Sequence, residues 1–209
     1  MAATENSIFG QYLDLFAHTE IFIFVFMEIV TRLEPIQRVI FRKAKLNDYI
    51  IFTIIFGLFS IFGTYIGIPD SSGAISNIRD LAPMIAGLVA GPFVGLAVGL
   101  IGGIHRFFLG GPTCIPCSLA TVLAGVLAGV IYRLNNEKLL GIIPAMVFAC
   151  AFELLHAGLV LLIVRPFIDA YNIVLATIPQ MIIAVSLGMG ISIIIIHSTK
   201  ESSRPVTPE

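Results

Sequence analysis

The feature that most limits the fold is a succession of apolar segments, each long enough to cross a lipid bilayer. A spanning helix needs about 20 mainly apolar residues. The segments cover residues 12–30, 49–68, 81–104, 115–131, 139–164 and 173–196. Only 12% of the 209 residues are charged, against about 25% in soluble domains. The sequence therefore predicts an all-α, polytopic membrane helical bundle in the plasma membrane, and its net charge of −1 gives no indication of nucleic-acid binding.

The third apolar segment, residues 81–104, has two interpretations that give different topologies. It is rich in glycine and contains Gly91-Pro92, a dipeptide suited to a turn because proline ends a helix and glycine accepts unusual dihedral angles. If the segment turns there and leaves on the side it entered, nine Lys and Arg residues lie inside and three outside. A plain span leaves seven inside and five outside. Because Lys and Arg favour the cytoplasmic face, the count favours a re-entrant hairpin.

The predicted topology therefore has five spans and one glycine-rich re-entrant hairpin, with the N-terminus outside and the C-terminus in the cytoplasm. Six plain spans are the alternative. Residues 1–198 are expected to form one transmembrane domain, followed by a disordered polar tail over residues 199–209. The glycines of the hairpin are expected to let the half-helices and their neighbours pack closely.

Two arginines, Arg79 and Arg106, bracket the predicted hairpin on the face that has few other cations. The planar guanidinium group suits carboxylates because it donates two parallel hydrogen bonds. Hydroxyl groups of Thr113, Ser118 and Thr121 follow Arg106, and the start of the next helix adds backbone donors. We expect these groups to form an anion site in an exposed cleft; the alternative is that the arginines are interfacial anchors.

Other polar residues in apolar surroundings are weaker candidates. Arg165 supplies a third cation on the outer face, and Cys117 is expected to line the pocket as a small, soft side chain. Glu153 and His156 are three residues apart and so share one face of a helix. They are a structural hydrogen-bonded pair, a contact with the ligand or a signal relay. The pair Cys114 and Cys117 has no context that indicates redox chemistry or a zinc site.

The sequence resembles the membrane input domain of LytS-type sensor histidine kinases, the five-transmembrane LYT domain. The matching residues are Gly63-Thr64-Tyr65, Gly67, Asn77-Ile78-Arg79-Asp80, Gly87, Gly91-Pro92, Gly102-Gly103-Ile104-His105-Arg106, Gly110-Gly111, Cys117, Ala124-Gly125, Glu153, His156 and Arg165-Pro166-Phe167.

The resemblance implies a sensor in two-component signalling, placed ahead of GAF and histidine-kinase or GGDEF output modules. Some members of the family respond to extracellular pyruvate. Arg79, Arg106 and Cys117 match the positions expected to form that pocket. Ser118 and Thr121 flank the position expected to carry a further hydroxyl group, which is Ala120 here.

The sequence thus predicts a membrane receptor that binds a small extracellular carboxylate, pyruvate first, and passes the signal inward to an output module. A carboxylate transporter, or its substrate-binding subunit, is the alternative because broken helices are common in transporters; a structural scaffold is a third. The expected partners are the ligand, the bilayer, a second copy in a homodimer, and a kinase or response-regulator system. No cofactor, metal or enzymatic activity is expected, since the sequence reveals no nucleophile–base pair or set of metal ligands.

Overall fold

The computed structural model describes residues 17–66, 68–69 and 75–202 of the chain. The first helix is described over residues 17–30. The later helices are α2 (Glu34–Ile40), α3 (Leu46–Tyr65), α4 (Leu81–Ala90), α5 (Pro92–Phe108), α6 (Cys114–Leu134), α7 (Ile142–Ile163) and α8 (Phe167–Ser202). Two short strands, β1 (Ile68–Pro69) and β2 (Ile75–Ser76), pair antiparallel with Ile68 opposite Ser76.

The predicted helical membrane protein is confirmed at this level. Within the described residues, α3, α6, α7 and α8 are long and apolar enough to cross a membrane, whereas α4 and α5 are shorter. The first sixteen residues, which include the start of the predicted first span, lie outside the described part, as do residues 203–209 of the predicted tail. Helix α8 continues to Ser202, so residues 199–202 are helical.

The third apolar segment is divided at Gly91-Pro92, where the sequence predicts a break. Gly91 has φ 88° and ψ −179°, a conformation that only glycine adopts without strain. Pro92 then begins α5, where its missing N–H is not needed. The two helices pack against each other: a Cβ atom built on Gly95 lies 2.9 Å from the Gly87 Cα atom. The segment is therefore two short helices side by side rather than one continuous helix.

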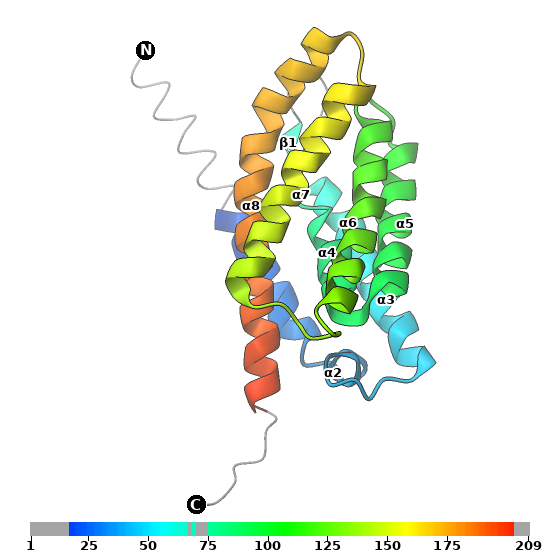
Figure 1. The fold of residues 1–209 in the computed structure, drawn as a ribbon, viewed down its shortest axis with the longest axis vertical. Coiled ribbons are helices and arrows are strands. Elements are labelled where there is room, and N and C mark those ends of the chain that lie inside the picture. Colours follow the sequence, from blue (N-terminus) through cyan, green and yellow to red (C-terminus); the bar gives the residue numbers. More distant parts are fainter. Residues whose placement is uncertain (1–16, 67, 70–74, 203–209) are drawn as a thin grey trace, which may run out of the picture.

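Helix α4 lies in the middle of the bundle, with α7 and α8 on one side and α3, α5 and α6 on the other (Figure 1). Every residue from Leu81 to Val89 is buried. A helix end exposes backbone groups that have no partner in the helix, and broken helices at membrane depth persist where protein covers them. The enclosure of α4 supplies that cover.

Glycines permit the closest helix contacts, as the sequence predicts. Cβ atoms built on Gly95 and Gly125 would each collide with the backbone of the other residue, so α5 and α6 meet main chain to main chain. Gly87 faces the same part of α6, because a Cβ atom built on it would lie 2.7 Å from the Gly129 nitrogen atom. Gly91 differs, because its Cβ atom would lie 3.6 Å from the Tyr132 ring, an ordinary contact. Glycine is needed at position 91 for its dihedral angles and not for space.

Replacing Gly91 with alanine is expected to destabilise the protein by about 1–3 kcal/mol, the cost of a non-glycine residue in such a conformation. Gly158→Ala is the matched control: Gly158 lies in α7 with nothing within 4 Å of its Cβ position. That change should stabilise the helix by up to about 1 kcal/mol. Thermal unfolding in detergent measures both, and equal melting temperatures for the two variants would contradict this account of the break.

Candidate functional site

The backbone of Arg79 is fixed at the entrance to α4 by groups from two other segments. The Asn77 Oδ1 atom accepts a hydrogen bond from the Arg79 N–H at 3.1 Å, and the Ser60 hydroxyl of α3 donates to the Arg79 carbonyl at 3.1 Å. A Cβ atom on Gly63 would lie only 3.2 Å from the Arg79 Cα and N atoms. The absence of a side chain at position 63 therefore lets α3 approach this backbone closely.

The Arg79 side chain is fully buried, yet two of its three guanidinium nitrogen atoms have no acceptor within the described residues. Its Nε atom donates to the Thr121 hydroxyl at 2.6 Å and lies 3.5 Å from Asp80 Oδ1. The terminal atoms Nη1 and Nη2 are buried and have no hydrogen-bond partner among the residues that the structure describes. The guanidinium group is thus held by its inner edge and keeps its outer pair of donors available.

Thr121 joins three parts of the site through one hydroxyl group. Besides accepting from Arg79, this group lies 2.6 Å from Asp80 Oδ1 and 2.9 Å from the Cys117 carbonyl oxygen, both acceptors. A hydroxyl has one proton to donate, so it bonds one of these acceptors at a time. Thr121 therefore connects the start of α4 to the first turns of α6.

Arg106, at the end of α5, is buried and faces the same end of α6. Its Nη1 atom donates to the Gly110 carbonyl, and its Nη2 atom donates to the Thr113 hydroxyl at 3.0 Å. Its Nε atom is buried without a partner in the described part of the chain. The expected exposed cleft is wrong, because the exposed fractions of Arg79 and Arg106 are 0% and 1%. The hydrogen bonds formed by their donors favour this enclosed position.

The hydroxyl groups of α6 have roles other than helix capping. Thr113 is the N-cap residue of α6 but makes no capping hydrogen bond, since its side chain accepts from Arg106. Ser118 lies inside α6, and its buried Oγ atom has no partner within the described residues. Thr113, Ser118 and Thr121 therefore all lie at the end of α6 that is near Arg79 and Arg106. The Ser118 hydroxyl group has no hydrogen-bond partner within the described residues.

Glu153 and His156 of α7 contact each other and extend the cluster to Cys117. His156 Nδ1 lies 3.3 Å from Glu153 Oε2 and 3.2 Å from Asp80 Oδ2, while Nε2 lies 3.3 Å from the Cys117 sulfur atom. Glu153 and His156 are buried, and Cys117 is 6% exposed. The predicted contact within the Glu153–His156 pair is confirmed, and the pair joins α7 to α4 and α6.

Arg165 is the one candidate that the structure does not bring into this group. It is exposed in the turn between α7 and α8, and its Nη1 atom donates to the carbonyl groups of Leu161 and Val164. These are the unsatisfied carbonyls at the end of α7, a common use of arginine at a helix C-terminus. Cys114 and Cys150 are partly exposed thiols outside the hydrogen bonds of the cluster.

Sequence reasoning missed two features of the site. Asp80, the counter-ion shared by Arg79 and His156, was noted only as part of a motif, although an acidic residue beside a buried arginine was a usable signal. The contact between Cys117 and His156 joins residues 39 positions apart, so no local spacing predicts it. The structure thus brings a thiol and an imidazole ring into contact, which the sequence analysis did not predict.

Asp80, Glu153 and His156 also form the one group in the described chain with the residue types and spacing of a metal site. One ligand atom from each lies within 4.8 Å of the others. The Arg79 Nε atom is 3.5 Å from Asp80 Oδ1, and its charge opposes a second cation at this place. The arrangement is better explained as two carboxylates that accept hydrogen bonds from His156, with Arg79 as the nearby cation.

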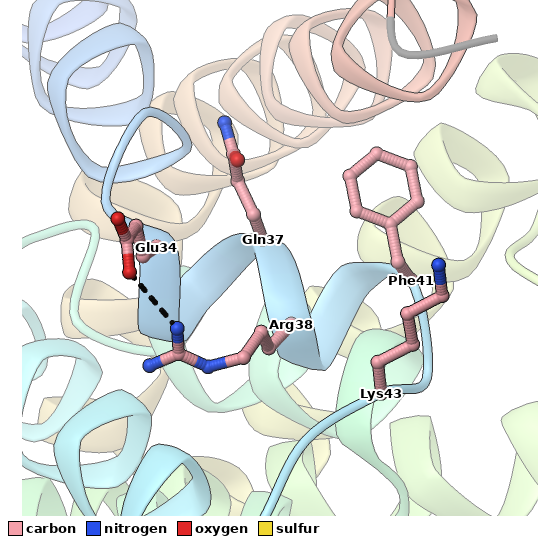
Figure 2. A pocket seen from close by; sticks show the side chains of 5 residues that line it. All are labelled: Glu34, Gln37, Arg38, Phe41 and Lys43. Atoms are coloured by element: carbon pink, nitrogen blue, oxygen red, sulfur yellow. Dashed lines mark hydrogen bonds and ion pairs between the residues drawn. The ribbon is translucent and has the colours of Figure 1, made fainter. Parts of the chain in front are cut away.

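A separate hollow lies at α2 and shares no lining residue with the cluster. It is lined by Glu34, Gln37, Arg38, Phe41 and Lys43. Figure 2 shows Gln37 and Phe41 projecting to one side of α2, while Arg38 pairs with Glu34 at 3.1 Å. Arg38 also donates two hydrogen bonds to Asp48 of α3. Two ion pairs of Arg38, one with Glu34 and one with Asp48, therefore lie at this hollow.

The family of the chain follows from comparison with known proteins. A family model described as "5TMR of 5TMR-LYT" matches residues 33–199, which include the whole cluster. The chain belongs to the 5TMR-LYT family. The resemblance to the membrane input domain of LytS-type sensor kinases is thereby confirmed, and α3 to α8 all lie within the matched region.

Curated relatives of this 5TMR-LYT domain are sensor proteins. It is 31% identical over 143 residues to sensor histidine kinase BtsS of Escherichia coli K12, covering 66% of this chain and 25% of that protein. It is 36% identical over 157 residues to sensor protein LytS of Bacillus subtilis 168 (65% and 26%). For sensor protein LytS of Bacillus cereus the identity is 30% over 190 residues (81% and 31%).

The 5TMR-LYT chain therefore spans about a quarter to a third of the length of these relatives. It is a membrane input domain of the type found in LytS- and BtsS-type sensor kinases. No solved structure matches it.

Thr121→Val is expected to destabilise the domain by about 1–3 kcal/mol, because the nearly isosteric change leaves a buried guanidinium N–H without an acceptor. The control is Thr177→Val in α8: Thr177 is also buried, but its hydroxyl bonds only the Ile173 carbonyl of its own helix. That variant should change stability by less than about 0.5 kcal/mol. Thermal unfolding compares the two, and similar losses would mean that Thr121 has no special role.

Proposed function

We propose that this domain is the sensor of a membrane signalling protein and that it binds a small carboxylate at Arg79. The observation that carries the proposal is the pair of buried Nη atoms of Arg79, both without an acceptor in the described chain. A buried charged group with unsatisfied donors is costly. A carboxylate would satisfy both donors in the parallel geometry that guanidinium groups favour.

The surroundings of Arg79 support a ligand of small size. Arg106 Nε and Ser118 Oγ are further buried polar atoms without partners at the same end of α6, so a second polar group on the ligand has donors nearby. The enclosure by α3, α4, α5 and α6 excludes bulky ligands. Pyruvate, with one carboxylate and one ketone oxygen, is our first choice.

The proposed topology makes α4 and α5 a re-entrant hairpin that opens to the outside. Figure 1 supports it: α5 ends near the α7–α8 turn, and α2 lies at the other end of the bundle. That other end holds most of the basic residues, and this distribution favours a cytoplasmic position for it. They are Arg32, Arg38, Arg42, Lys43, Lys45, Arg133, Lys138 and Lys200. The N-terminus is then outside and the C-terminus inside.

Transmission would proceed through α7 and α8. Glu153 and His156 attach α7 to Asp80, the neighbour of the ligand-binding arginine, and α7 packs along α8. A ligand that binds one arrangement of the cluster more tightly shifts α7 and α8 toward it. The output would be a kinase region of the kind named in the relatives, acting on a response regulator, with a homodimer as the signalling unit.

Arg79→Lys keeps the cation but loses the paired donors, so it should weaken pyruvate binding by about 1.5–3 kcal/mol. This corresponds to roughly a 10- to 150-fold rise in dissociation constant, measured by calorimetry on the purified chain. Arg165→Lys is the matched control, since Arg165 is exposed and bonded to α7 carbonyls. Unchanged binding in the Arg79 variant would place the site elsewhere.

Ligand uptake into liposomes, rather than binding alone, would favour the transporter alternative.

The topology is tested by labelling single cysteines with an impermeant reagent after the three native cysteines are replaced by alanine. Exposed positions Phe108 and Asp169 should react from outside intact cells, and exposed positions Lys43 and Lys138 only after permeabilisation. Six plain spans would place Phe108 inside and Lys138 outside. That exchanged pattern would exclude the re-entrant hairpin.

A further inference from the structure

Cys117, His156 and two carboxylates form a row of hydrogen-bonding groups. Cys117 lies at one end of this row, and the carboxylates lie at the other. Its sulfur atom is 3.3 Å from His156 Nε2, and the opposite ring nitrogen Nδ1 is 3.3 Å from Glu153 Oε2 and 3.2 Å from Asp80 Oδ2. An ionised carboxylate only accepts hydrogen bonds. Nδ1 therefore carries a proton, and the Nε2 lone pair of the neutral ring faces the thiol. This is the orientation in which an imidazole acts as a base toward a nucleophile.

Cationic groups lie near Cys117 in the cluster. The Arg79 Nε atom and the Cys117 carbonyl oxygen both bond the Thr121 hydroxyl group, and Arg106 donates to Thr113, four residues before Cys117. The residue also stands in the first turn of α6, where the helix dipole favours an anion. Thiolates are favoured at helix N-termini and beside cationic groups. The Cys117 environment therefore stabilises the anionic, nucleophilic form of the thiol.

The sulfur atom and the open donors of Arg79 belong to side chains of one hydrogen-bonded cluster. Thr121 bonds both the Arg79 Nε atom and the Cys117 carbonyl oxygen. A carboxylate held by the Arg79 Nη atoms would have its adjacent carbon in the part of the cluster that contains Cys117. In a 2-oxo acid that carbon is an electrophilic ketone.

We propose that Cys117 binds 2-oxo acids covalently and reversibly, by adding its sulfur to the ketone carbon of a ligand whose carboxylate is held by Arg79. The inference rests on the proposed carboxylate site and adds the way in which a 2-oxo acid is held there. His156 Nε2 takes the thiol proton, the sulfur–carbon bond forms, and the carbon–oxygen π bond breaks. The alkoxide then takes the proton back from His156. The product is a hemithioketal; nothing is oxidised or reduced, and the reverse steps release the ligand.

This chemistry explains why a cysteine, a histidine and two carboxylates are assembled around a carboxylate-binding arginine. A site for any small carboxylate needs only the arginine and hydroxyl donors. An addition step gives discrimination between a 2-oxo acid and the corresponding 2-hydroxy acid, which has nearly the same shape but no electrophilic carbon. Covalent capture also removes the thiol proton that faces His156 Nε2, and His156 is the residue that joins the site to α7.

The test uses the purified 209-residue chain and pyruvate labelled with ¹³C at the ketone carbon. In carbon NMR, the bound ligand should give a signal from a tetrahedral carbon bonded to sulfur and oxygen, separate from the signals of the free ketone and its hydrate. Cys150→Ser is the matched control and should keep this signal, since Cys150 is a thiol of α7 outside the cluster. Cys117→Ser should lose it.

Affinities for pyruvate and lactate give a second measurement. The parent chain should prefer pyruvate by about tenfold or more, and Cys117→Ser should reduce this preference to near one while lactate affinity stays within about threefold. His156→Gln should reduce the preference in the same direction. The NMR measurement on the parent chain needs no variant, so it holds even if Cys117→Ser does not fold.

Failure of this inference and failure of the proposed function give different results. Saturable pyruvate binding that depends on Arg79, with the ketone carbon signal unchanged in character, would overturn covalent capture and leave the carboxylate sensor intact. A parent chain that binds neither pyruvate nor lactate would overturn both. An adduct signal that persists in Cys117→Ser would assign the nucleophile to another residue and overturn the role of Cys117.

Discussion

The need to neutralise a charge inside an apolar helical bundle organises this structure. Arg79 is fully buried, and its inner edge is bonded or paired only to Thr121 and Asp80. A buried ion pair with incomplete hydrogen bonding loses more in desolvation than it gains, so the groups around Arg79 must come from several directions. Ser60 of α3, Thr121 of α6 and, through Asp80, His156 of α7 meet at this one residue. The helices of the bundle are thereby tied together at the level of the site.

The same requirement accounts for the glycines, which lie where polar groups must approach through a helix surface. A Cβ atom on Gly102 of α5 would collide with the Ser60 hydroxyl and would lie 3.1 Å from Thr121 Cγ2. Gly103 meets the Ser118 carbonyl at 2.9 Å in the same way. Small residues allow helices in membranes to pack at short distances. Here they let Ser60 of α3 and Thr121 of α6 lie against α5 while each forms a hydrogen bond with Arg79.

The sequence predicts the parts of the fold that depend on local physics. Apolar length gives the helices, and the dihedral needs of Gly91 with the ring of Pro92 give the position of the break. The grouping of Arg79, Arg106 and the hydroxyls of α6 follows once the chain turns there. The depth of burial was not predictable, because it depends on side chains from α3 and α7 that are distant in sequence. For the same reason Asp80 and the Cys117–His156 contact appear only in three dimensions.

Helix α8 is longer than a bilayer span requires. Its 36 residues correspond to about 54 Å at 1.5 Å per residue, well beyond a hydrocarbon core of about 30 Å. Pro179 is the only proline within it, and it removes one backbone hydrogen bond there; the 23 residues from 180 to 202 follow without another proline. A displacement of α8 that begins on the C-terminal side of Pro179 meets no missing backbone hydrogen bond before Ser202, whereas one that begins before Pro179 must pass the position where that bond is missing.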